Sequence, residues 1–116
     1  MKIEGEGKLL RIFIGEGDRF GGKPLYQAIV EKARAAGLAG ATVIRGVMGF
    51  GAHSRMHAAK WLRLSEDLPL IIEIVDTEEK IRDFVHQIDD MFQDGLITIE
   101  KAEVIRYRAV PKTEKP

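Results

Sequence analysis

Four short apolar segments of the chain predict β-strands, because each is rich in β-branched or aromatic residues and ends near glycine, proline or charged residues. They span residues 9–14, 41–47, 70–75 and 96–99. Residues 104–107 form a candidate short extra strand. The glycine-rich, charged stretch between the first strand and the first helix, residues 15–23, is typical of a loop.

Two segments repeat apolar residues at helical spacing. In the first, Pro24 suits the opening turn of a helix and Gly37 ends it. In the second, Asp76 is the expected N-cap, and Glu79 three residues later completes a pair that resembles a capping box. The apolar positions are Leu25, Ala28, Ile29, Ala33 and Ala36 in the first helix and Ile81, Phe84, Val85, Ile88 and Phe92 in the second.

The resulting order is βαββαβ, which predicts an α+β, ferredoxin-like fold with two helices on one face of an antiparallel four-stranded sheet. The length of 116 residues suits one domain, 1–116. We expect a core of about residues 8–108, and a tail, residues 109–116, that is disordered.

The strands predict that both faces of the sheet are buried. Residues 70–75 barely alternate between apolar and polar side chains, and Arg11 is the one polar residue in 9–14. The two helices cover one face. Another subunit is the simplest cover for the second face, and the alternative is that the long loop before residue 68 folds back over it.

Composition excludes several classes of function. The formal net charge of zero disfavours a nucleic-acid partner. The chain has no cysteine, no signal peptide at its start and no apolar run long enough to span a membrane, so we expect a cytoplasmic protein. Phosphate-loop, nucleophile-elbow and dinucleotide-binding motifs are absent from the sequence, which argues against an enzyme.

Charge is unevenly spread, since residues 41–65 contain no acidic side chain. A stretch of this kind favours anions. The alternative is that its cations pair with carboxylates elsewhere in the fold. The basic residues and histidines of the stretch are Arg45, His53, Arg55, His57, Lys60 and Arg63.

Three short features could bind phosphate. Gly49 and Gly51 flank Phe50 at the exit of the second strand, where their backbone can approach a ligand closely. Gly95 lies in a tight turn before the last strand, and Arg106 and Arg108 would share one side of an extended segment. Each has an ordinary alternative: a strand-end turn, a simple turn, and a charged edge strand.

His53 and His57 are spaced i, i+4, which places two metal ligands on one face of a helical turn. No third ligand lies nearby in the sequence, because His86 belongs to a separate helix. Polar surface is therefore the alternative reading, and a metal cofactor is not expected.

Five motifs in chain order resemble those of the PII signal-transduction proteins over roughly residues 8–108. They are Gly40-Ala-Thr-Val, Gly49-Phe-Gly, Leu68-Pro with Glu73-Ile-Val, Asp94-Gly95, and Arg106-Tyr-Arg. The chain is most similar to a PII-like branch of unassigned function that carries the insertion at residues 15–25 and the sequence of residues 40–46. PII proteins themselves have a shorter connection at the first of these places.

The resemblance implies a homotrimer whose sheets face inward and whose clefts between subunits bind an adenine nucleotide. It places Thr42 and Glu73 near the base, and Gly49 and Gly51 at the start of a ligand-sensitive loop, residues 47–68, that contacts a target protein. It also implies that Gly95, Arg106 and Arg108 lie at the phosphates.

Two departures from the family pattern refine this expectation. Leu96 stands where the family has a phosphate-binding lysine, so we expect AMP or ADP in preference to ATP. The stretch from Gly51 to Leu68 has no tyrosine, so it cannot be nucleotidylated on tyrosine as in the family. The alternative function is a metal-binding trimer that resembles the divalent-cation tolerance proteins and uses His53 and His57.

Overall fold

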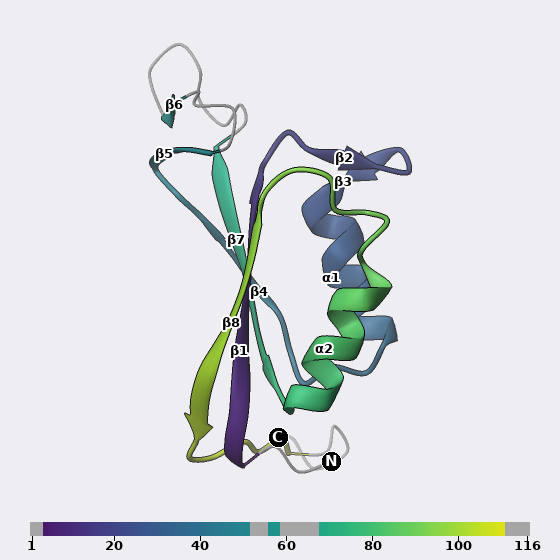
Figure 1. Ribbon diagram of the computed structural model, residues 1–116, viewed down its shortest axis with the longest axis vertical. Helices are drawn as coiled ribbons and strands as arrows, with labels where there is room; N and C mark the ends of the chain where they lie inside the picture. Colours follow the sequence, from purple (N-terminus) through teal and green to yellow (C-terminus); the bar gives the residue numbers. More distant parts are fainter. Residues whose placement is uncertain (1–3, 52–55, 59–67, 111–116) are drawn as a thin grey trace.

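The computed structural model describes residues 4–51, 56–58 and 68–110 (Figure 1). Its two helices are α1 (Leu25–Ala35) and α2 (Glu78–Gln87). Its strands are β1 (Gly5–Gly15), β2 (Arg19–Phe20), β3 (Lys23–Pro24), β4 (Thr42–Arg45), β5 (Met48–Phe50), β6 (Met56–Ala58), β7 (Pro69–Asp76) and β8 (Leu96–Val104).

The main sheet has the strand order β4-β7-β1-β8, and every neighbouring pair is antiparallel. Both helices lie on the same side of this sheet (Figure 1). Along the chain the principal elements follow as β1, α1, β4, β7, α2 and β8. The predicted α+β, ferredoxin-like βαββαβ fold is therefore confirmed.

The core lies between the sheet and the helices. Alternate residues of β1 and β7 point into it, because successive side chains of a strand point to opposite faces. Ile29 of α1 and Ile81 and Phe84 of α2 are fully buried against them. The strand residues that form this layer are Leu10, Ile12, Ile14, Leu70, Ile72 and Ile74.

Several element boundaries differ from those expected. Asp76 is the last residue of β7 and is fully buried, so the expected N-cap was wrong by one residue. The N-cap of α2 is Thr77, whose side chain accepts a hydrogen bond from the backbone N–H of Lys80. Glu79 then falls at the second helical position and forms no capping box.

The last strand is longer than expected, and the candidate short extra strand was wrong. β8 continues to Val104 because its second half pairs with the N-terminal half of β1, from Gly5 to Leu9. Residues 105–110 follow β8 without regular secondary structure. The expected loop at residues 15–23 contains a small hairpin formed by β2 and β3. β5 and β6 form a second hairpin within the expected long loop.

Candidate functional site

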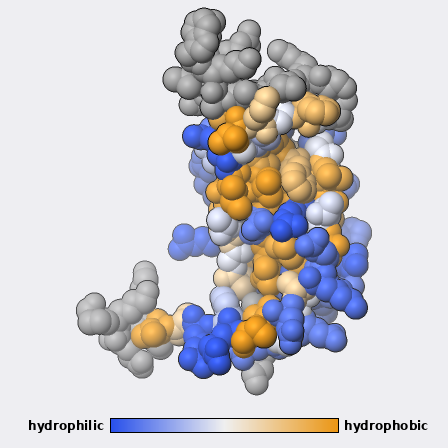
Figure 2. Space-filling model, turned by 90° about the vertical axis from the view of Figure 1, so that its left-hand side faces the viewer, coloured by the Kyte–Doolittle hydropathy of each residue, from blue (hydrophilic) through white to orange (hydrophobic). Residues whose placement is uncertain are grey.

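No element among the described residues covers the face of the sheet opposite the helices (Figure 1). Residues paired directly opposite each other on neighbouring strands have their side chains on the same face of the sheet. One row across the sheet joins four apolar side chains from its four strands: Ile44, Ile71, Phe13 and Leu96. Leu9 and Val75 form another apolar pair on the same face. Figure 2 shows this side of the molecule, where hydrophobic surface is broken by a band of hydrophilic residues.

The face opposite the helices thus carries apolar side chains, and its burial by another subunit stays a prediction. Ile44 is 41% exposed and Leu96 is 54% exposed, both at the edges of the sheet. A contiguous exposed apolar face is typical of interaction surfaces in proteins. The alternative cover, the long loop, lies largely outside the described residues.

The middle row of the open face is polar and runs from Thr42 through Glu73 and Arg11 to Thr98. The Arg11 guanidinium donates to the Glu73 carboxylate at 2.9 Å and to the Glu100 carboxylate at 3.2 Å. The hydrogen bond to Glu73 raises the pKa of Arg11 above its ordinary value, and the charge of Glu100 adds to this effect. The Arg11 guanidinium therefore lies between two carboxylates on a face whose neighbouring rows are apolar.

This cluster of Arg11, Glu73 and Glu100 was not predicted from the sequence. Glu73, which is expected near a nucleotide base, pairs with Arg11 in the single chain. Thr42, expected near the same base, is the register partner of Glu73. Their place at a nucleotide stays a prediction. The sequence signal for the cluster was Arg11 itself, a single charge within an apolar strand.

Gly46, Gly49 and Gly95 gather at the end of the sheet where β1 finishes and β7 begins. Gly46 N–H donates to the Pro69 carbonyl at 2.7 Å, and a Cβ atom added to Gly49 would lie 3.2 Å from the Pro69 ring. Gly95 has φ +139°, and an added Cβ would collide with the carbonyl oxygen of Phe13. Glycine is therefore needed in this turn for both conformation and space.

The segment that leaves this end carries exposed apolar side chains. Val47 is 78% exposed, Met48 is 56% exposed and Phe50 is 67% exposed. No described atom lies within 4 Å of the position of a Cβ added to Gly51. This surface lies at the start of the expected ligand-sensitive loop, residues 47–68.

One cation of the acid-free stretch has a partner in the structure. Arg45 pairs with the Glu16 carboxylate at 2.5 Å. The alternative of ion pairing elsewhere in the fold is therefore correct for Arg45. Arg55, Lys60 and Arg63 lie outside the described residues.

Arg106 and Arg108 lie at the opposite end of the sheet from the glycines. Both are exposed, and they follow β8 where Val104 pairs with Gly5 at the start of β1. The strand β1 has eleven residues, so the two ends are separated by roughly 30 Å at about 3.3 Å per residue. Figure 1 shows the end of β8 and the β5–β6 hairpin at opposite ends of the molecule.

A single chain therefore does not bring the predicted site residues together. It places Gly49 and Gly95 at one end, Thr42 and Glu73 in the middle of the open face, and the arginines at the other end. A pocket for a drug-sized ligand has a volume of about 300–1,000 Å³ and is roughly 10 Å across. No such ligand can contact both ends of one chain.

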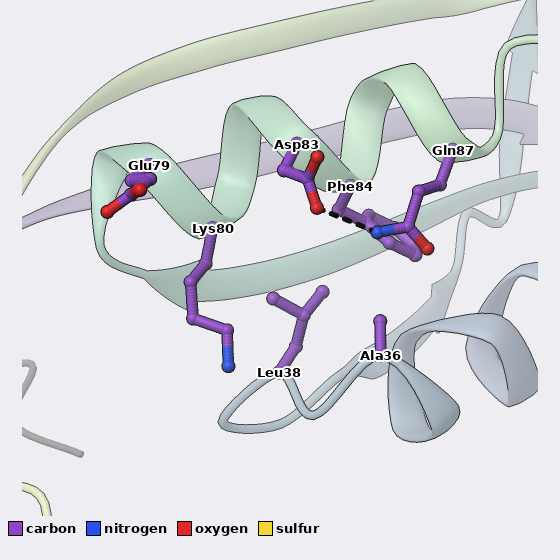
Figure 3. Close-up of a pocket in the computed structure, with 7 residues that line it drawn as sticks. All are labelled: Ala36, Leu38, Glu79, Lys80, Asp83, Phe84 and Gln87. Carbon is purple, nitrogen blue, oxygen red and sulfur yellow. Dashed lines mark hydrogen bonds between the residues drawn. The ribbon is translucent and has the colours of Figure 1, made fainter.

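The helical side of the molecule has a hollow of about 370 Å³ between the end of α1 and α2 (Figure 3). Gln87 donates to Asp83 at its rim, and the Lys80 ammonium group donates to the Gly37 carbonyl at 2.6 Å. Its lining residues are Ala36, Leu38, Glu79, Lys80, Asp83, Phe84 and Gln87. None of them belongs to the predicted site.

The predicted histidine pair lies partly outside the described residues. His53 lies outside the described residues, and His57 belongs to β6, where it is paired with Gly49. Within residues 4–51 and 68–110, no group of three or more histidine or acidic side chains is placed to hold a metal ion. Among the helices that the structure describes, none is long and apolar enough to cross a membrane.

The chain matches the DUF190 family model, described as "Uncharacterized ACR, COG1993", over residues 7–104. A UPF0166 protein of Aquifex aeolicus is 45% identical over 98 residues, which cover 84% of this chain and 92% of that protein. A UPF0166 protein of Methanocaldococcus jannaschii is 35% identical over 102 residues, covering 87% of this chain and 94% of that protein.

Solved structures show the same fold. CPII from Thiomonas intermedia K12, described as a nitrogen regulatory PII-like protein bound to ADP, AMP and bicarbonate, has a TM-score of 0.68 at 18% identity, covering 87% of this chain and 90% of its own. The divalent ion tolerance protein CutA1 from Ehrlichia chaffeensis has a TM-score of 0.55 at 10% identity, covering 97% and 91%. At these identities the likeness shows the fold alone.

The family match, the curated relatives and the shared fold agree with the motifs in the sequence. They confirm the resemblance to a PII-like branch of unassigned function. The chain belongs to the DUF190 family, and it has the fold of the PII-like protein CPII.

Proposed function

We propose that this protein is a regulator that binds an adenine nucleotide between the subunits of a homotrimer and signals through residues 47–68. The division of the candidate site between two ends of the sheet carries the proposal. Gly49 and Gly95 of one chain need the Arg106 and Arg108 of another copy to form one binding site. An open apolar sheet face provides the surface through which copies can associate.

The charged row on the open face favours a specific association over a random one. Arg11 already pairs with Glu73 and Glu100, so two neighbouring sheets can bury this row without leaving a lone cation. The remaining negative charge favours a basic side chain on the facing copy. Complementary charges fix the register between two copies, which apolar contacts alone would not specify.

The expected ligand is AMP or ADP in preference to ATP. The fold is shared with CPII, which is described as bound to ADP and AMP. Two arginines form a phosphate clamp because each guanidinium donates two parallel hydrogen bonds. Leu96, the first residue of β8, is apolar and offers no contact to a further phosphate.

The proposed signal is a change in residues 47–68 when the nucleotide binds. Gly49 lies against Pro69, where the segment leaves and rejoins the sheet. A ligand bound beside Gly49 contacts some conformations of residues 47–68 more favourably than others. Binding therefore shifts the populations of these conformations. The exposed side chains of Val47, Met48 and Phe50 supply an apolar contact for a target protein.

Calorimetric titration with AMP, ADP and ATP tests the proposal. We expect micromolar binding by the wild type, and its loss in an Arg106→Ala/Arg108→Ala double variant, in which only weak, millimolar binding remains. An Arg34→Ala/Arg82→Ala variant is the matched control, because it removes two exposed arginines from the helices. If none of the three nucleotides binds at millimolar concentration, the proposal is wrong.

Sedimentation tests the assembly separately. We expect a trimer whose dissociation on dilution is opposed by the nucleotide, because a ligand that bridges subunits stabilises their association. A monomer at all concentrations would exclude a site shared between subunits, whatever the titrations show.

The alternative function is a divalent-metal-binding trimer, for which CutA1 offers a likeness of fold alone. Zinc or copper binding that disappears in His53→Ala and His57→Ala variants would favour it. Metal binding that survives both substitutions would remove the assignment of these histidines.

We further propose that residues 1–116 form one cytoplasmic domain that catalyses no reaction and binds no nucleic acid. Chromatography of each nucleotide after prolonged incubation with the protein tests the absence of catalysis. New products formed at a rate proportional to protein concentration would contradict it.

A further inference from the structure

Residues 105–110 follow the last strand and could be expected to fray, because few contacts hold a chain beyond its final element. The structure instead ties this segment at one residue, Tyr107. Its backbone N–H donates to a Glu4 carboxylate oxygen at 2.9 Å. Its side-chain hydroxyl donates to the Ala39 carbonyl at 2.8 Å. Two distant parts of the chain thus hold one exposed residue.

The loop whose Ala39 carbonyl accepts the Tyr107 hydrogen bond is itself held by hydrogen bonds. Ala39 N–H donates to Asp76 Oδ2 at 2.9 Å, and Thr77 N–H donates to Asp76 Oδ1 at 2.7 Å. Asp76 is fully buried, and it satisfies both backbone donors with one carboxylate. Lys80 adds a bond from its ammonium group to the neighbouring Gly37 carbonyl at 2.6 Å. The loop that carries the Ala39 carbonyl is therefore held to β7 by Asp76 and to α2 by Lys80.

Tyr107 lies between the two arginines of the candidate phosphate clamp. Fixing its backbone N–H and its ring restricts where the chain can carry Arg106 on one side and Arg108 on the other. Groups that are held near their bound positions lose less conformational entropy when a ligand arrives. The fastening at Tyr107 therefore has a consequence for affinity.

We propose that Tyr107 is a positioning residue that fastens residues 105–110 to the loop at Ala39 and so holds Arg106 and Arg108 ready for the phosphates. This inference rests on the proposed nucleotide-binding function. Tyr107 contacts no ligand in this account, since both of its described polar groups are already engaged within the chain. Its effect should therefore depend entirely on the arginines.

A double-mutant cycle tests the inference. Tyr107→Phe removes only the hydroxyl, and Tyr26→Phe is the matched control because it removes a hydroxyl from a half-buried tyrosine of α1. By calorimetry we expect Tyr107→Phe to bind ADP about fivefold more weakly than wild type, the usual effect of one neutral hydrogen bond. Tyr26→Phe should bind like wild type.

The cycle is completed in a variant that lacks both arginines, Arg106→Ala/Arg108→Ala, titrated at high ADP concentration. Tyr107→Phe should have no further effect there, because the residue acts through the groups already removed. The inference is overturned if Tyr107→Phe lowers the affinity for ADP a further fivefold in that background, or abolishes the binding that remains there. Either result would mean that Tyr107 acts independently of the arginines.

The remaining outcomes separate the two proposals. Wild-type binding with an unchanged Tyr107→Phe variant overturns the positioning role and leaves the nucleotide-binding function standing. Absence of wild-type binding overturns both. The midpoint of thermal unfolding of Tyr107→Phe should match that of Tyr26→Phe, and a large drop confined to Tyr107→Phe would assign the residue to stability instead.

Discussion

The buried carboxylate of Asp76 provides the sharpest test of how the fold is held together. Asp76 ends β7, is fully buried, and accepts hydrogen bonds from the N–H groups of Ala39 and Thr77. Asp76→Ala leaves both donors without this acceptor. It also detaches the loop after α1 from the start of α2.

The magnitude follows from the two bonds. A hydrogen bond to a charged group contributes about 1.5–3 kcal/mol, so the pair contributes about 3–6 kcal/mol. Removing the carboxylate also removes the cost of burying it, which offsets part of the loss. We therefore expect Asp76→Ala to lower the free energy of unfolding by about 3 kcal/mol. Asp76→Asn should cost about half as much, because its amide oxygen still accepts one of the two bonds.

Urea unfolding followed by circular dichroism measures this difference. All variants need the same protein concentration, because association of copies adds to apparent stability. The matched control is Asp89→Ala, which removes an exposed carboxylate and should change stability by less than about 0.5 kcal/mol. An Asp76→Ala variant as stable as Asp89→Ala would refute the reasoning.

Three further predictions follow from the structure. Gly95→Ala should lower the free energy of unfolding in urea by about 1–3 kcal/mol, because a φ of +139° and the Phe13 carbonyl of β1 leave no room for a Cβ atom. Gly40→Ala is the control, since no described atom lies within 4 Å of its added Cβ and it should have little effect; equal effects of the two substitutions would contradict the prediction. Arg11→Met should shift sedimentation toward smaller species, because it leaves two carboxylates facing each other on the proposed interface, and an unchanged distribution would argue against that interface. The hydrogen bond from Lys23 holds the pKa of Glu31 below its ordinary value of 4.5, so this pair contributes stability above that pH and loses it as the pH falls through the lowered pKa. In an NMR titration the Glu31 midpoint should rise in Lys23→Met, and an unchanged midpoint would exclude the pair as the cause.

The fold could be predicted from the sequence because its elements differ in hydrophobic period. The short, nearly continuous apolar runs at residues 9–14 and 70–75 indicated strands, and the spacing of Ile81, Phe84 and Ile88 indicated a helix. Element boundaries were less predictable where tertiary pairing decides them. Leu96 to Val104 forms one strand only because β1 provides a partner along its whole length.

The candidate site was less predictable for a related reason. Arg11 lies 62 residues from Glu73 and 89 from Glu100 in the sequence, and only the register of three strands brings their side chains together. Tyr107 had no sequence signal apart from its place between two arginines. The motif residues could be named one by one, but their separation along the sheet depends on strand length and direction.

That separation gives the assembly a role beyond stability. A chain with its glycine turns at one end of the sheet and its arginines at the other cannot close on a small ligand by itself. If neighbouring copies bring these ends together, each nucleotide contacts two subunits, and binding and association become linked equilibria. The open face, with Arg11 between Glu73 and Glu100, then determines which register of copies is allowed. Tyr107 determines how well the arginines of one copy are placed for the next. Affinity for the nucleotide is in this view a property of the interface, and substitutions far from any phosphate can change it.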